Sequence, residues 1–150
     1  GPGLTGTLGL SELPASHRRG VHAALKLMEE RLAEVARWMD EGGRRSGTLE
    51  LVDDLDPALK DQVRQRLAAL QAQVEAAALD LGLPRERLDL SRRCLGTLGL
   101  TWELAPDLRP ERMTGYGPVP GPLRPELTRL AAGLEQPLLD LLRLLERNRE

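Results

Sequence analysis

The sequence is poor in cysteine, in aromatic residues and in uninterrupted apolar runs. Cys94 is the single cysteine among 150 residues, which excludes an intrachain disulfide and a zinc site built from spaced cysteines. A lone cysteine is typical of a reducing compartment, so we expect a cytoplasmic location. No stretch approaches the roughly 18 apolar residues of a membrane-spanning helix. We therefore expect no membrane partner.

Aromatic residues make up 2% of the chain, and phenylalanine is absent. The core must therefore be aliphatic, which suits closely packed helices. The net charge is −2, so no overall positive charge attracts nucleic acid or an anionic membrane surface. Binding of that kind would need a local basic patch.

Apolar residues recur at alternating three- and four-residue steps in four stretches of the chain. This spacing places them on one face of a helix. The clearest run is Val21, Leu25, Met28, Leu32, Val35 and Met39. The pattern predicts an all-α, four-helix-bundle-like single domain over residues 11–150. Residues 1–10 are expected to form a flexible arm, in which Gly1-Pro2 resembles a protease-cleavage scar.

Capping residues, prolines and glycines set the predicted boundaries of the first two helices. The first helix is expected to run from Ser11 to about Glu41. A start at Ser16 would place the basic residues 17–19 against the positive end of the helix dipole, so the earlier start is favoured. The second helix is predicted from Asp56-Pro57 to Gly82. A short link after it would make the second and third helices antiparallel neighbours.

The connection over residues 42–55 contains the alternating segment Thr48–Val52, which resembles a strand but has no obvious partner strand. We interpret it as an extended loop that packs its leucines. The third helix should end before Pro106, and it contains Gly96 and Gly99. Each glycine costs about 1 kcal/mol relative to alanine, which favours close approach of a neighbouring helix as compensation.

A long proline- and glycine-rich connection over residues 106–125 is predicted to hold one helical turn at 110–113. Tyr116 is expected to bury its ring against the bundle. The fourth helix should reach Arg147, with a kink near Pro137. Its inward stripe is predicted to be Leu127, Leu130, Leu134, Leu138, Leu141 and Leu145.

The residues that carry chemistry do not form a recognisable catalytic or metal-binding pattern. His17 and His22 are five residues apart, about 140° around a helix, so they are poorly placed to share one metal. The Glu-x-x-His pairing of di-metal bundles is missing. Cys94 lies in a mostly apolar helical setting. We therefore predict a protein that is not an enzyme and has no cofactor or metal.

The end of the fourth helix is more leucine-rich than one neighbouring helix requires. Either this helix is the central one of a monomer, or part of its surface packs on another chain. The leading hypothesis is a non-catalytic helical interaction or assembly module that can form a homo-oligomer. The candidate partner-binding residues are Leu139, Leu142 and Leu144.

Clusters of arginine give an alternative hypothesis, a nucleic-acid-binding accessory protein. Arginine neutralises phosphate groups, and separate clusters can act together if the fold brings them to one face. Interleaved acidic residues favour salt-bridged, solvent-exposed faces instead. The candidate residues are Arg18, Arg19, Arg44, Arg45, Arg92 and Arg93.

Overall fold

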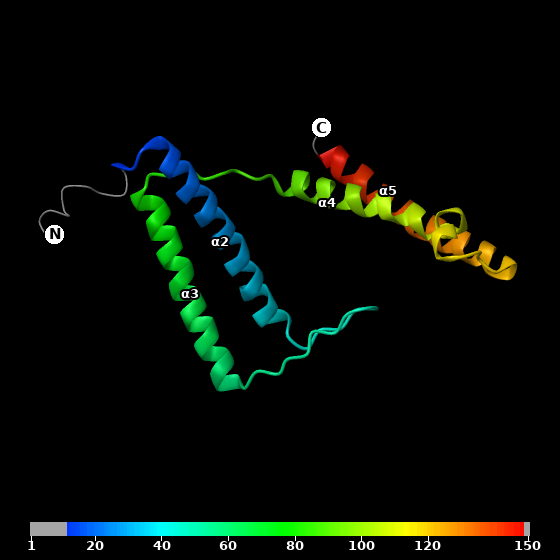
Figure 1. The fold of residues 1–150 in the computed structure, drawn as a ribbon, viewed down its shortest axis with the longest axis horizontal. Coiled ribbons are helices and arrows are strands. Elements are labelled where there is room, and N and C mark those ends of the chain that lie inside the picture. The colour runs from blue at the N-terminus through cyan, green and yellow to red at the C-terminus, as the bar shows by residue number, and fades with distance from the viewer. Residues whose placement is uncertain (1–11, 149–150) are drawn as a thin grey trace, which may run out of the picture. The chain divides into compact units, whose positions relative to one another are not determined.

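The structure, a computed structural model, describes residues 12–148 and is all-α (Figure 1). The helices are α2 (Ala15–Glu41), α3 (Pro57–Asp80), α4 (Leu90–Leu104) and α5 (Arg124–Asn148). Within the described range the only extended pairing is one isolated bridge between Arg45 and Glu50. The all-α class and the four helices are therefore confirmed. The predicted flexible arm lies outside the described residues. The favoured helix start at Ser11 was too early, because α2 begins at Ala15 after Pro14.

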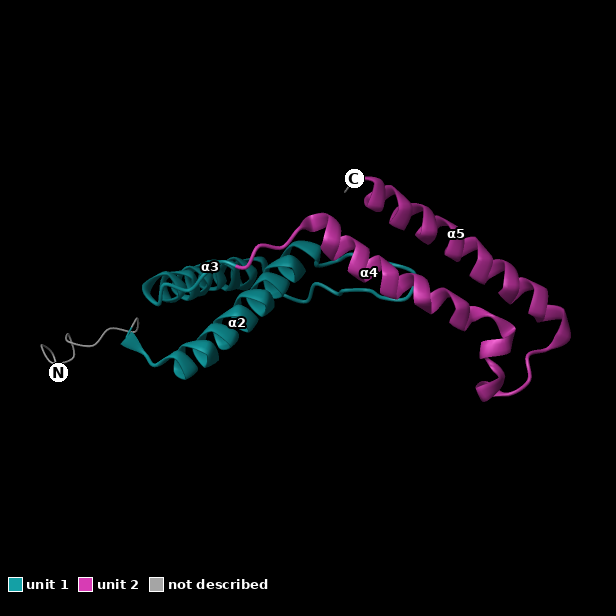
Figure 2. Ribbon diagram, turned by 90° about the horizontal axis from the view of Figure 1, so that it is seen from above, with its two compact units in different colours: residues 1–85 teal, residues 86–150 magenta. Residues whose placement is uncertain are grey.

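The chain divides into two compact units, residues 1–85 and residues 86–150 (Figure 2). In the first unit α2 packs against α3, and in the second α4 packs against α5. Extended chain over residues 83–89 precedes α4, so the link after α3 is longer than expected. The single bundle domain over 11–150 and the antiparallel contact between the second and third helices stay predictions.

In the first unit, α2 begins at Ala15, so basic residues do lie in its first turn. The guanidinium of Arg18 donates a hydrogen bond to the carbonyl oxygen of Leu81, just past the end of α3. Carbonyl groups at a helix C-terminus carry partial negative charge. The end of α3 therefore offsets the unfavourable position of Arg18 at the positive end of its own helix.

The end of α3 has the geometry of a Schellman motif. Gly82 has a φ of +62°. Its N–H bonds to the Leu79 carbonyl, and the N–H of Leu83 bonds to the Ala78 carbonyl. Glycine adopts this left-handed conformation without a Cβ penalty, so the predicted stop at Gly82 is confirmed.

Between α2 and α3 the chain forms a small hairpin. The N–H of Gly43 donates to the carbonyl of Leu51, and the N–H of Leu51 donates to the carbonyl of Arg44. The strand-like segment therefore pairs with residues 43–46. These residues precede it in the chain and come alongside it because the chain reverses direction between them. The prediction that its leucines pack was wrong, because Leu49 is 75% exposed.

In the second unit, the segment after α4 wraps onto α5 through short 3₁₀ turns. These are η2 (Ala105–Leu108), η3 (Pro110–Arg112), η4 (Thr114–Tyr116) and η5 (Gly121–Leu123). The predicted turn at 110–113 corresponds to η3, and Pro110 is fully buried. Tyr116, in contrast, is 96% exposed, so its predicted burial was wrong.

Gly96 and Gly99 of α4 have open space around them, and Pro137 lies inside α5. A Cβ added at Gly96 or Gly99 would meet no atom of a neighbouring element within 4 Å, so a close-packed neighbour is not the reason for these glycines. Helix α5 continues through Pro137 without a break. The predicted bend there stays a prediction.

The core of the described chain is small. Its buried apolar side chains are Val74, Leu81, Ala105, Pro110 and Ala131. Most leucines of the helices are half-buried or exposed, since a helix in a two-helix layer has one packed side. Apolar surface is therefore left uncovered, and on α5 the exposed leucines follow a regular helical spacing.

Candidate interaction surface

Helix α5 carries two adjacent apolar stripes, and only one of them packs within the second unit. The packed stripe contains Ala131, which is fully buried, and the half-buried side chains of Leu138 and Leu145. It faces α4 and η2, the elements that contact α5 most. Near its middle, Glu135 accepts two hydrogen bonds from Arg109, at 2.8 and 3.1 Å. These bonds raise the pKa of Arg109 and fasten the loop to α5.

The second stripe lies about a quarter turn around α5 and is exposed. Leu130, Leu134, Leu141 and Leu144 keep 48%, 46%, 44% and 54% of their surface accessible. Pro137 lies between them and is also exposed. We call these five residues the α5 seam. The prediction that Leu130, Leu134 and Leu141 face inward was wrong, because α4 covers only the neighbouring stripe.

The seam follows a heptad repeat, in which positions a and d form the contact face of a coiled coil. Positions a are Leu127, Leu134 and Leu141, and positions d are Leu130, Pro137 and Leu144. The e positions, residues 131, 138 and 145, belong to the packed stripe. Helix α4 therefore uses the side of the heptad next to a and leaves most of the a/d face open.

Of the predicted partner-binding leucines, Leu144 alone lies on the seam. Leu144 belongs to the seam and is 54% exposed. Leu142 is half-buried and lies outside the seam. Leu139 is half-buried outside the seam. The excess of leucine singled out the helix that carries the exposed stripe. The heptad spacing was visible in the sequence, but the neighbouring stripe also contains leucine, so the structure was needed to identify the open face.

The structure does not bring the arginine clusters of the first unit together. Arg18 and Arg19 lie in the first turns of α2, whereas Arg44 and Arg45 follow its last turn. At 1.5 Å per residue, this helix of 27 residues separates its ends by about 40 Å. Arg44 also pairs with Glu41 at 3.8 Å. The remaining candidates, Arg92 and Arg93, are exposed on α4 in the second unit.

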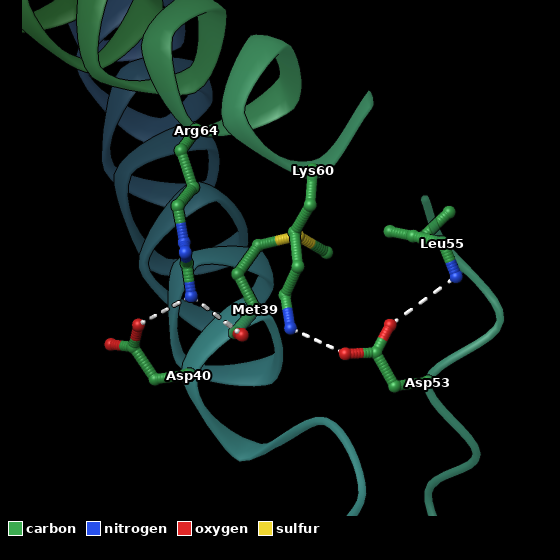
Figure 3. Close-up of polar contacts among 6 residues, drawn as sticks. All are labelled: Met39, Asp40, Asp53, Leu55, Lys60 and Arg64. Atoms are coloured by element: carbon green, nitrogen blue, oxygen red, sulfur yellow. Dashed lines mark hydrogen bonds and ion pairs between the residues drawn. The ribbon is translucent and has the colours of Figure 1, made fainter. Parts of the chain in front are cut away.

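A polar cluster fixes the connection that carries the hairpin (Figure 3). The Asp53 carboxylate accepts hydrogen bonds from Lys60 Nζ at 2.5 Å and from the backbone N–H of Leu55 at 3.2 Å. These bonds lower the pKa of Asp53, that from Lys60 most strongly. Beside it, Arg64 on α3 donates to the Met39 carbonyl at the end of α2. The cluster has a structural role, since every group in it is paired with a neighbour.

The hairpin and the end of α2 also line an open pocket of about 370 Å³. Trp38, Leu49 and Leu51 supply its apolar wall, and Arg44, Arg45 and Glu50 supply charges of both signs. Mixed charge gives the pocket no preference for an anionic or a cationic ligand. Its exposed tryptophan and leucines are compatible with protein contacts.

Metal-ligand clusters and membrane-spanning helices are absent from the part of the chain that the structure describes. Among residues 12–148 no three potential ligands from histidine, cysteine, aspartate and glutamate come together. Cys94 is half-buried on α4. No helix within that range has the length and apolar content needed to cross a bilayer. Comparison with protein-family models, curated proteins and solved structures finds no match for this chain.

Proposed function

We propose that this protein is a non-catalytic helical interaction or assembly module, and that the α5 seam is its binding surface. The observation that carries the proposal is the accessible heptad face of α5. Its four leucines are each about half exposed although they follow the spacing of a helix–helix contact. An apolar stripe of this order is typical of a surface that a second helix covers. The lone Cys94 favours a cytoplasmic setting for this assembly.

The magnitude of the uncovered surface supports the proposal. Complete burial of a leucine side chain contributes roughly 1.5–3 kcal/mol. The seam leucines are 44–54% exposed, so covering each one contributes about half of that amount. Association costs on the order of 4–15 kcal/mol in lost freedom. Because each of two contacting helices can contribute such a face, the combined gain is comparable with this cost.

Nucleic-acid binding stays the alternative prediction. The separation of the two arginine clusters along α2 gives it no support. A phosphate backbone would have to contact both ends of one helix at once. Near the second cluster, Glu41 pairs with Arg37 and Arg44. We therefore favour the protein-binding function.

Thiol accessibility tests the proposal directly. In a Cys94→Ser background, Leu134→Cys places a thiol on the seam, and Leu138→Cys places a matched thiol on the packed stripe. At low protein concentration we expect the thiol at 134 to be alkylated much faster than that at 138. Equal protection of both thiols in the dilute, folded protein would show that the seam is already covered, and the proposed function would be wrong.

A further inference from the structure

The charges beside the α5 seam indicate what kind of helix can cover it. The edge of the seam away from α4 is formed by the heptad g positions, which are Glu126, Gly133, Asp140 and Arg147. Glu126, Asp140 and Arg147 are exposed. In a two-helix contact, g residues lie beside the apolar face and select partner and orientation. A helix that covers the seam should therefore carry charges complementary to this edge.

An antiparallel second copy matches the apolar residues of the seam. In that orientation each a residue packs beside a d residue of the other helix. Leu141 then lies against Leu130 of the second copy, and Leu127 lies against Leu144 of the second copy. In the central layer Leu134 lies against Pro137. Every layer contains apolar residues from both chains, and the two-fold symmetry produces each layer twice.

The same register also matches the charges. It places Glu126 opposite Arg147 of the second copy at both ends of the contact. Gly133 lies opposite Asp140, so this carboxylate meets no like charge and keeps its hydrogen bond from Gln136. Glu126 pairs with Arg129 within its own chain, but both side chains are well exposed and remain accessible. Two opposite-charge pairs thus flank one continuous apolar seam.

A parallel second copy matches less well. Parallel coiled coils place g residues opposite e residues of the partner. Glu126 would then lie opposite Ala131 and Asp140 opposite Leu145, on the side that α4 covers. Charged groups would lose water without gaining a partner, which costs free energy. The charge pattern therefore discriminates between the two orientations.

We infer that the α5 seam binds a second copy of this chain, with the two α5 helices antiparallel and Glu126 of each beside Arg147 of the other. This inference rests on the proposed function, since it names the partner of the same surface. The acidic residue in the first turn and the basic residue in the last also complement the dipole of α5 itself. A test must therefore separate pairing between chains from effects within one helix.

Two charge-reversal variants, measured alone and mixed, separate pairing between chains from effects within one helix. In the full chain, Glu126→Lys places like charges together at both ends of the contact, and so does Arg147→Glu. We expect each variant alone to dimerise roughly tenfold more weakly in sedimentation equilibrium. In an equimolar mixture both pairs become attractive again, and we expect affinity close to that of the unaltered chain. Effects on a single helix would not be reversed by mixing.

Arg66→Glu is the matched control, because this exposed arginine lies on α3 and the charge change is the same. We expect it to leave dimerisation unchanged. The inference is supported if the mixture regains the affinity of the unaltered chain and neither variant does so by itself. Unchanged dimerisation in both single variants, or a mixture no tighter than its components, would overturn the antiparallel register. If the chain were monomeric at every concentration and the thiol at 134 stayed reactive, the partner would not be a second copy. The proposed function would then remain intact.

Discussion

Leu141 and Leu138 are three residues apart on α5, yet the structure assigns them opposite roles. Leu141 lies on the exposed seam, and Leu138 is half-buried in the stripe that packs against α4. Glutamine is similar in length to leucine and tolerates a helix well. Replacing each leucine by glutamine therefore separates the contribution of the seam from that of the fold.

The expected magnitudes follow from the exposed fractions. Leu141 is 44% exposed, so covering this exposed part on association contributes about 0.7–1.3 kcal/mol per chain. Two copies of the substitution in a symmetric pair then weaken association about tenfold or more. At low concentration Leu141→Gln should lower the free energy of unfolding by less than Leu138→Gln does, because a smaller fraction of Leu141 is covered within the chain. Leu138→Gln should lower it by about 1–2 kcal/mol, because apolar contact with α4 is lost.

Urea unfolding at high dilution measures the free energy of unfolding, and sedimentation equilibrium measures association. Circular dichroism at both concentrations confirms that each variant remains helical. If Leu141→Gln destabilised the dilute chain as much as Leu138→Gln, the seam would already be covered within the chain. If it left association unchanged, the seam would not be the contact surface. Either result would refute the reasoning.

Three further predictions concern other parts of the molecule. Gly96→Ala should raise the free energy of unfolding by about 1 kcal/mol in chemical denaturation, because the added methyl group meets open space on α4; a loss of stability would contradict this. Asp53→Asn should destabilise the chain near neutral pH and have little effect once the pH falls below the lowered pKa of Asp53, since the carboxylate that Lys60 binds is then protonated in both states; thermal unfolding at several pH values measures this, and an equal effect at all pH values would count against it. Single-stranded RNA should not bind at physiological salt in fluorescence anisotropy; salt-sensitive binding that is lost in the double variant Arg44→Ala and Arg45→Ala would restore the nucleic-acid hypothesis.

The helix boundaries were largely predictable because local residues determine them. Asp56-Pro57 starts α3, Gly82 ends it, and the stretch from Arg124 to Asn148 forms one helix as its leucine spacing predicted. The start of α2 was wrong because the dipole argument considered that helix alone. The compensating carbonyl belongs to Leu81, 63 residues away in the sequence.

Which apolar residues are covered was much less predictable. Leucines on two adjacent stripes of α5 have the same chemistry, and only tertiary contacts decide which stripe α4 occupies. Leu130, Leu134 and Leu141 were assigned inward for that reason, and Tyr116 was assigned to the core on residue type alone. The excess of leucine in α5 could be read from the sequence, whereas the identity of its open face required the structure.

The most direct test of the seam as an assembly surface is sedimentation equilibrium of the unaltered chain and of Leu141→Gln over a wide range of protein concentration. The unaltered chain should pass from monomer to dimer as the concentration rises, and the variant should do so only at markedly higher concentration. Self-assembly through α5 would be contradicted if the unaltered chain stayed monomeric throughout, or if the variant dimerised equally well.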